Sequence, residues 1–154
     1  MPNVAERLAA LGLVLPAPAK AAANYLPFVR TGDLVFIAGQ LAFVDGVLKH
    51  PGRVGDTLSL DDGVAAARLC ALNVLAQAGA ACEGDFSAIA RCVRLGVFVA
   101  SDPGFTDQAL VANGASEVIV AALGETGRHV RLAVGVPVLP FGASVEIEAV
   151  FALG

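Results

Sequence analysis

Apolar residues recur along this chain with two different spacings, and the spacing predicts where helices and strands form. At residues 3–12 they recur every three or four positions, which is typical of a short amphipathic helix. The segment "FVRTGDLVFIAG" instead predicts a hairpin, in which one strand ends at Arg30, the turn contains Gly32-Asp33, and a second strand spans residues 34–38.

The rest of the chain predicts a loop, two long helices and three further strands. Residues 40–57 are expected to form a loop with one short strand near residues 47–49, and Ser59 with Asp62 carries the N-cap pattern of the helix that follows. The expected elements are then a helix from residue 60 to about 78, ended by Gly79, a strand over 89–101, a helix over 106–123, ended by Gly124, and strands near 128–138 and 143–152.

This order of elements, ββ(β)αβαββ, predicts a two-layer α+β sandwich, in which two helices cover one face of a mostly antiparallel sheet. The first long helix is apolar nearly all round, which is typical of a helix buried against a sheet. The chain has no internal repeat, and its length suits a single domain over residues 1–154. Residues 1–23 are expected to be an N-terminal helix and its lead-in.

The composition is poor in charge, because 56% of the residues are hydrophobic and only 16% are charged, against about a quarter in an average soluble domain. Such a domain tends to bury part of its surface against copies of itself, so we expect a homo-oligomer. No run of 18 uncharged apolar residues occurs, and Glu6 and Arg7 interrupt the segment where a signal peptide would be apolar. These features predict a cytoplasmic protein without a membrane span.

Charge and motifs exclude several classes of function. The net charge is −4 and no basic cluster exceeds Arg128, His129 and Arg131, so nucleic-acid binding is disfavoured. Cys70, Cys82 and Cys92 are not spaced as a metal site and are expected to be free buried thiols. No zinc, phosphate-loop or dinucleotide motif is present, and we expect no metal and no organic cofactor.

The last two strands carry charges that need an explanation. Alternation in the final strand places an apolar set of side chains on one face and Glu146 and Glu148 on the other. The carboxylates could face water, or a neighbouring copy could cover them, and a covered carboxylate needs a partner. Arg131 on the preceding strand is the expected counter-ion.

The blocks around these charges resemble a known family. An arginine, an apolar strand, "LP" and "VEIEA" resemble the C-terminal signature of the Rid (reactive intermediate deaminase, YjgF-like) family. "NYLPFVRTGDLVFIAGQL", "ALNVLAQAGA" and "VRLGVFVASDPGF" are similar to further blocks of that family, in the same order. The resemblance covers roughly residues 24–152 and indicates a divergent branch.

The resemblance implies a fold, an assembly and an activity. The implied fold is chorismate-mutase-like, in a homotrimer whose three sheets form a central barrel with clefts between subunits. The implied activity is hydrolysis of enamines and imines, such as 2-aminoacrylate or 2-iminopropionate, to 2-keto acids and ammonia, with water as co-reactant. The partner would be a small molecule that carries a carboxylate.

The resemblance also implies site residues. Arg131 matches the arginine that binds the substrate carboxylate, a role suited to a guanidinium fork, and Glu146 matches a carboxylate that orients or activates water. Tyr25 matches a cleft tyrosine that would reach the site from a neighbouring subunit, and Asn113 stands where the family often has an asparagine. Gly39 could let a ligand approach the backbone closely, so these three are the expected substrate-binding residues. Ordinary structural roles stay open for each: an ion pair for Arg131 and Glu146, packing for Tyr25, a turn or bulge for Gly39, and helix hydrogen bonding for Asn113.

Other residues near these motifs leave the function open. Ala38 stands where many archetypal members have a serine, so one hydroxyl contact to substrate is missing. His129 could shuttle protons or be an ordinary strand histidine, His50 is expected in a loop, and Glu148 is expected to be structural. A non-catalytic module that binds a small carboxylate is therefore the second hypothesis. A ribonuclease is the third, and the acidic charge balance counts against it.

Overall fold

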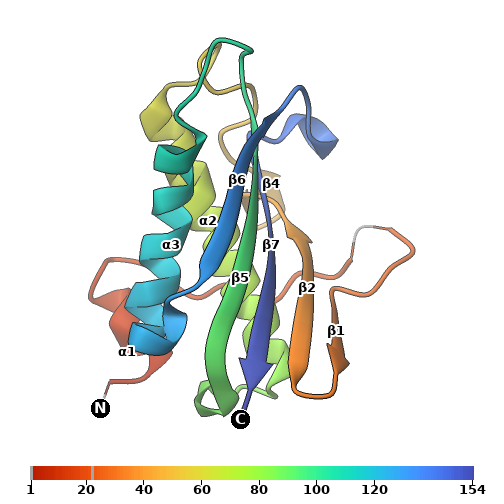
Figure 1. Cartoon of the computed structure of the whole chain (residues 1–154), viewed down its shortest axis with the longest axis vertical. Coiled ribbons are helices and arrows are strands. Elements are labelled where there is room, and N and C mark those ends of the chain that lie inside the picture. Colours follow the sequence, from red (N-terminus) through yellow and green to blue (C-terminus); the bar gives the residue numbers. More distant parts are fainter. Residues whose placement is uncertain (1, 22) are drawn as a thin grey trace.

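The computed structural model describes residues 2–21 and 23–154, and it has the predicted two-layer α+β architecture (Figure 1). Helices and strands in chain order are α1 (Val4–Ala9), β1 (Phe28–Thr31), β2 (Leu34–Gln40), β3 (Phe43–Val44), β4 (Val47–Leu48), α2 (Leu60–Ala81), β5 (Ile89–Ala100), α3 (Gln108–Leu123), β6 (Val130–Val136) and β7 (Val145–Leu153). Three short 3₁₀ helices, η1 (Phe86–Ala88), η2 (Gly124–Gly127) and η3 (Pro140–Gly142), lie between them.

The main sheet has five strands in the order β1-β2-β7-β5-β6. Neighbouring strands are antiparallel except for β5 and β6, which are parallel and are joined by α3. A parallel pair requires such a crossover, because its strands run in the same direction. Strand β7 occupies the middle of the sheet, and β6 and β1 form its two edges.

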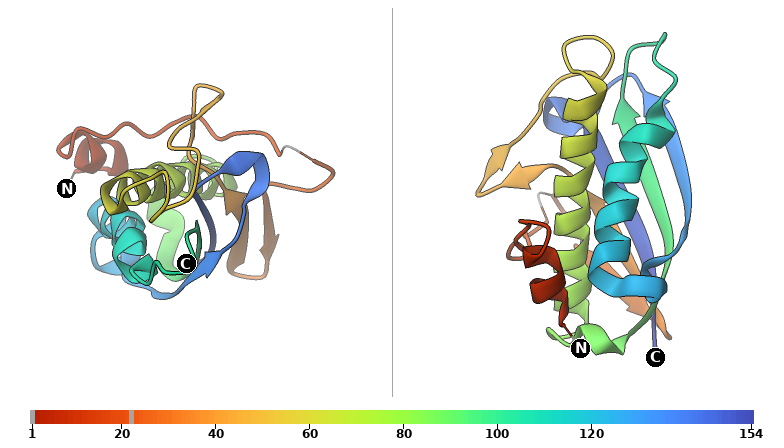
Figure 2. Two further views of the ribbon diagram at one scale, coloured as in Figure 1. Left: turned by 90° about the horizontal axis from the view of Figure 1, so that it is seen from above. Right: turned by 90° about the vertical axis from the view of Figure 1, so that its left-hand side faces the viewer.

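The two faces of the sheet differ in what covers them. Figure 2 shows α2 and α3 on one side, and the alternate residues of β7 that face them, from Val145 to Phe151, are buried as predicted. The opposite face, here called the open face, carries an ion pair of 2.7 Å between Nη1 of Arg94 and Oε1 of Glu148. Exposed large apolar side chains from β1, β2 and β6 lie on the same face: Val29, Leu34, Phe36, Val130 and Leu132.

Helix α2 begins as predicted and ends later. Ser59 and Asp62 form a reciprocal capping box at its start. The helix continues past Gly79, which does not act as a helix stop. A Cβ at this position would lie 2.7 Å from the ring of Phe86, so the glycine allows the helix to pack closely against that ring. By length and composition α2 could cross a membrane, yet 67% of its most apolar window is buried inside the fold, as in a core helix.

The segment expected to be a loop with one strand contains two short strands, β3 and β4, which pair as a hairpin. Its turn residues Asp45 and Gly46 both have positive φ, of 49° and 79°, and such turns favour Asp-Gly. Nδ2 of Asn73 in α2 donates to the carbonyl oxygens of Leu41 and Phe43 at 2.8 and 3.0 Å. These bonds fix the chain that leaves β2.

Candidate functional site

The five residues singled out from the sequence form two groups that lie apart within one chain. Arg131 and Asn113 belong to the first group, on β6 and α3. Tyr25, Gly39 and Glu146 line one pocket beside β2 and β7. Strand β5 separates β6 from β7, so no single protomer brings all five together.

Arg131 faces the helices. It pairs in register with the buried Leu95 of β5, and its guanidinium donates from Nη1 to Oγ of Ser116 and from Nη2 to the carbonyl oxygen of Ala109, both at 2.9 Å. Glu146 lies opposite Phe98, on the other face of the sheet. The expectation that Arg131 is the counter-ion of Glu146 or Glu148 within the chain is therefore wrong.

Asn113 lies on the face of α3 that holds the arginine. Positions 109, 113 and 116 are spaced four and three residues apart on α3, so they share one face of the helix. Asn113 is exposed on that face, between the two groups that hold the guanidinium. We call Arg131, Asn113 and Ser116 the cationic cluster. Ser116 was not anticipated from the sequence, because only the packing of α3 against β6 brings it to Arg131.

The second group encloses a pocket of about 130 Å³, here called the acidic pocket. Gly39 lies in a β-bulge, where the register between β2 and β7 shifts. A Cβ at this position would collide with Oε1 of Glu146 and lie 2.9 Å from its Cδ. The missing side chain at Gly39 thus allows the carboxylate of Glu146 to pack against the bulge. The pocket is lined by Ala19, Lys20, Ala21, Tyr25, Pro27, Gly39, Gln40, Leu41, Phe43, Pro140, Phe141 and Glu146.

The carboxyl group of Glu146 is electrostatically uncompensated. Burial raises its pKa above the usual value, and the nearby negative charge of Glu148 raises it further. Glu148 itself pairs with Arg94. Within residues 2–21 and 23–154, no cation lies within ion-pairing distance of Glu146. A carboxylate with a raised pKa and free oxygens can accept a proton from water.

Two contacts far apart in sequence hold the walls of the acidic pocket. Nε2 of Gln77 in α2 donates to the carbonyl oxygen of Ala19 at 2.6 Å, which ties the lead-in segment to the core. The rings of Phe43 and Phe141 meet edge to face, with centroids 5.9 Å apart. Lys20 and Phe141 also line the pocket, and neither was anticipated, because loop residues carry no periodic signal.

Ala38 lies outside this pocket. It lines a neighbouring groove on the open face, together with Arg94 and Glu148. Its carbonyl oxygen accepts from Nε2 of Gln40 at 3.0 Å. A serine at this position would thus carry its hydroxyl group in the lining of this groove and not in that of the acidic pocket.

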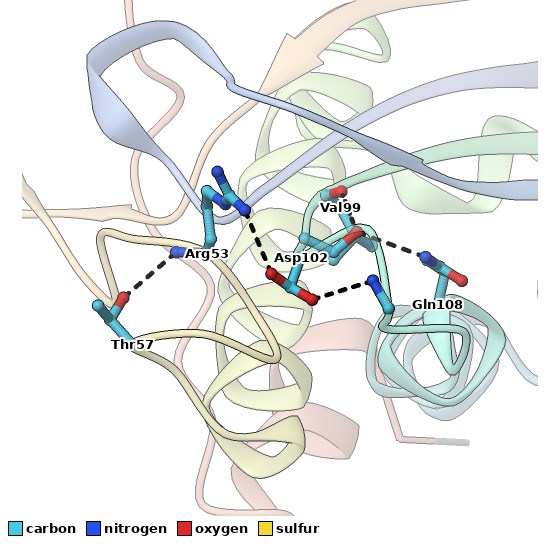
Figure 3. Close-up of polar contacts among 7 residues, drawn as sticks. Arg53, Thr57, Val99, Asp102 and Gln108 are labelled. Atoms are coloured by element: carbon cyan, nitrogen blue, oxygen red, sulfur yellow. Dashed lines mark hydrogen bonds and ion pairs between the residues drawn. The ribbon is translucent and has the colours of Figure 1, made fainter.

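A further hollow, of about 400 Å³, lies where β5 and β6 end, and Figure 3 shows polar contacts of residues that line it, among them Arg53, Asp102 and Gln108. Arg53 approaches Asp102 there at 3.5 Å, and Gln108 donates to the carbonyl oxygen of Phe105 at 2.9 Å. No residue predicted for the site lines this hollow.

His50 and the three cysteines have contacts or burial that indicate structural roles. His50 lies 3.8 Å from Asp62 at the start of α2. The three cysteines are free, and burial raises the pKa of Cys92 to about 12 and that of Cys70 well above its usual range. These two thiols stay protonated at neutral pH and are poor nucleophiles and metal ligands.

Comparison with known proteins agrees with this architecture. Residues 5–152 match the family model described as "YjgF/chorismate mutase-like, putative endoribonuclease". The chain is 48% identical over 152 residues to Protein TCP17 of Trypanosoma cruzi, covering 98% of this chain and 94% of that protein.

Two solved structures show how far the likeness extends. A protein of unknown function from Agrobacterium tumefaciens is 46% identical with a TM-score of 0.93, covering 98% of this chain and 92% of that one. RidA from a Psychrobacter species is 29% identical with a TM-score of 0.58, covering 89% and 94%. The fold is thus shared with RidA, while the details lie nearer to the first structure. The chain belongs to the YjgF/chorismate mutase-like family.

Proposed function

We propose that this protein hydrolyses enamines or imines of small carboxylic acids, of the 2-aminoacrylate and 2-iminopropionate type, to 2-keto acids and ammonia. The observation that carries the proposal is the division of the candidate residues into a cationic cluster and an acidic pocket in different parts of the chain. Each part has what the other lacks. The family membership and the 29% identity to a RidA support the same class of reaction.

The proposal requires two copies of the chain for each site. The cationic cluster of one subunit would face the acidic pocket of the next, in a homotrimer with three clefts. The open face supports such an assembly, because it exposes large apolar side chains, with Val130 at 68% and Phe36 at 46% exposure, and such surfaces mark interfaces.

The chemistry follows from the two groups. Arg131 would bind the substrate carboxylate, since two of its five N–H bonds are committed to α3 and no other described residue accepts from the rest. Glu146 would accept a proton from water as the oxygen attacks the carbon of the C=N bond. Glu146 passes this proton to the nitrogen, which gives a carbinolamine. Transfer of the hydroxyl proton to the nitrogen then breaks the C–N bond, so that ammonia leaves and the C=O bond of a 2-keto acid forms. Tyr25, Gly39 and Asn113 would contact the substrate.

A non-catalytic carboxylate-binding module is the second candidate, and the observation that favours it is Ala38, which supplies no hydroxyl group. Saturable binding of a 2-keto acid without turnover of any imine would support it. A ribonuclease is disfavoured by the net charge of −4.

The test is ammonia release from 2-iminopropionate, generated in the assay by an amino-acid oxidase. The wild-type protein should accelerate release. Arg131→Ala should lower kcat/KM by about a hundredfold, because a charge-assisted, bidentate contact is lost, while the oligomer stays intact by light scattering. Full activity in this variant would remove Arg131 from the mechanism.

A further inference from the structure

Ser116 links Arg131 to His129 through three short polar contacts. Oγ of Ser116 lies 2.9 Å from Nη1 of Arg131 and 2.9 Å from Nε2 of His129. Nδ1 of His129 lies 2.6 Å from the carbonyl oxygen of Gly127. The three side chains are half-buried, so their orientations depend on these contacts.

The direction of each hydrogen bond follows from the groups involved. The carbonyl oxygen of Gly127 can only accept, so Nδ1 of His129 carries a proton. In the neutral imidazole Nε2 is then the acceptor, and the hydroxyl of Ser116 donates to it. Arg131 can only donate, and it donates to a lone pair of the same hydroxyl oxygen. The series of hydrogen bonds therefore runs from Arg131 through Ser116 to His129 and ends on the carbonyl oxygen of Gly127.

Backbone packing fixes the position of Gly127, the last acceptor in this series of hydrogen bonds. Gly127 closes η2 and is buried. A Cβ at this position would lie 2.6 Å from the carbonyl oxygen of Ile119 and 3.0 Å from Cα of Val120. The absence of a side chain lets η2 pack directly on α3. The acceptor that orients His129 thus belongs to a rigid part of the fold.

We propose that Ser116 and His129 are positioning residues for Arg131, which hold its guanidinium in the orientation that binds a ligand carboxylate. The inference rests on the proposed function, in which Arg131 contacts that carboxylate. Ala109 supplies the second anchor through its carbonyl oxygen. With both anchors the guanidinium is pre-ordered, so less conformational entropy is lost on binding.

The experiment is calorimetric titration of the full-length protein with 2-oxobutyrate, a 2-keto acid of the proposed product class. Ser116→Ala removes the hydroxyl and keeps a strong helix former at that position. The pair His129→Asn and His129→Gln separates the two ring nitrogens. The Asn amide lies near the place of Nδ1 and does not reach Ser116, whereas the Gln amide lies near Nε2 and can accept from it.

We expect Ser116→Ala to weaken binding about tenfold, the effect of one lost hydrogen bond to a charged group. His129→Asn should weaken it about fivefold, and His129→Gln should stay within about twofold of wild type, because the link to Ser116 is restored. Glu117→Gln, which changes the next residue on α3 and its surface ion pair with Arg68, is the matched control and should bind as wild type does. The Ser116 and His129 variants should remain folded at the titration temperature, which thermal unfolding checks.

The titrations give different results if this inference fails and if the proposed function fails. Loss of binding in Arg131→Ala, with wild-type affinity in Ser116→Ala, would overturn the positioning role and leave the carboxylate site standing. Equal affinities for His129→Asn and His129→Gln would remove His129 from the role. No binding by the wild-type protein, or unchanged binding in Arg131→Ala, would overturn the proposed function and this inference with it.

Discussion

The cationic cluster and the acidic pocket are held in place by different forces. Arg131 is held by hydrogen bonds to α3, at 2.9 Å from both Ser116 and Ala109. Among the residues that the structure describes, none gives Glu146 comparable polar support; its carboxylate packs against the bulge at Gly39 and its pKa is raised. The guanidinium is therefore pre-ordered for binding, whereas the carboxylate is destabilised in its charged form and suited to accept a proton.

The cationic cluster and the acidic pocket also differ in the step that each could perform. A pre-ordered cation can bind a carboxylate without water being activated, and the carboxylate of Glu146 cannot itself bind the carboxylate of a substrate. Each part by itself would account for binding or for proton transfer, and the proposed catalysis requires both.

The largest effect is expected from Glu146→Gln. The amide keeps the size of the side chain and cannot take a proton from water, so kcat should fall by about a thousandfold. Binding of 2-oxobutyrate should change little, because Arg131 provides the carboxylate contact. The measurement is turnover of 2-iminopropionate beside calorimetry on the same sample. Loss of binding together with turnover would show that Glu146 also positions the ligand.

Gly39→Ala should disturb the acidic pocket alone. The added methyl group collides with the carboxylate of Glu146, and such overpacking costs about 1–3 kcal/mol of unfolding free energy. Turnover should fall about tenfold. In a Glu146→Ala background the same change should cost almost nothing in urea denaturation, since the colliding group is gone. An equal cost in both backgrounds would mean that the bulge itself requires glycine.

The smallest effect is a shift in pH dependence from Glu148→Gln. The proposed base works when ionised, so activity should fall as pH drops through the raised pKa of Glu146. Removing the charge of Glu148 removes the smaller cause of that raised pKa, so the acid limb should move to lower pH. The measurement is a kcat/KM profile, with Glu117→Gln as control. A shift to higher pH would contradict the electrostatic account.

The sequence predicted the fold better than the site. Apolar periodicity and capping motifs are local properties of the sequence. The buried face of β7 follows from the first, and the capping box at Ser59 follows from the second. The end of α2 does not, because the pattern predicts a stop at Gly79, whereas this glycine provides close contact with Phe86 inside the helix. Helix termination by glycine and close packing at glycine look the same in a single sequence.

The relation of Arg131 to Glu146 could not be obtained from local pattern. The two lie on consecutive strands in the sequence, which suggests adjacency, yet β5 is inserted between those strands. Ser116 was missed for a similar reason, since its contact with Arg131 depends on how α3 is rotated against β6. Strand order and helix rotation are tertiary properties that alternation along one strand does not contain.

The most direct test of a shared site is to mix two inactive variants. Arg131→Ala and Glu146→Gln subunits, combined in equal amounts by co-refolding, should form mixed trimers in which about a quarter of the clefts have both an intact arginine and an intact glutamate. Activity should therefore return to roughly a quarter of the wild-type value. Mixtures that form mixed trimers by mass spectrometry and stay as inactive as the separate variants would contradict a site built from two copies of the chain.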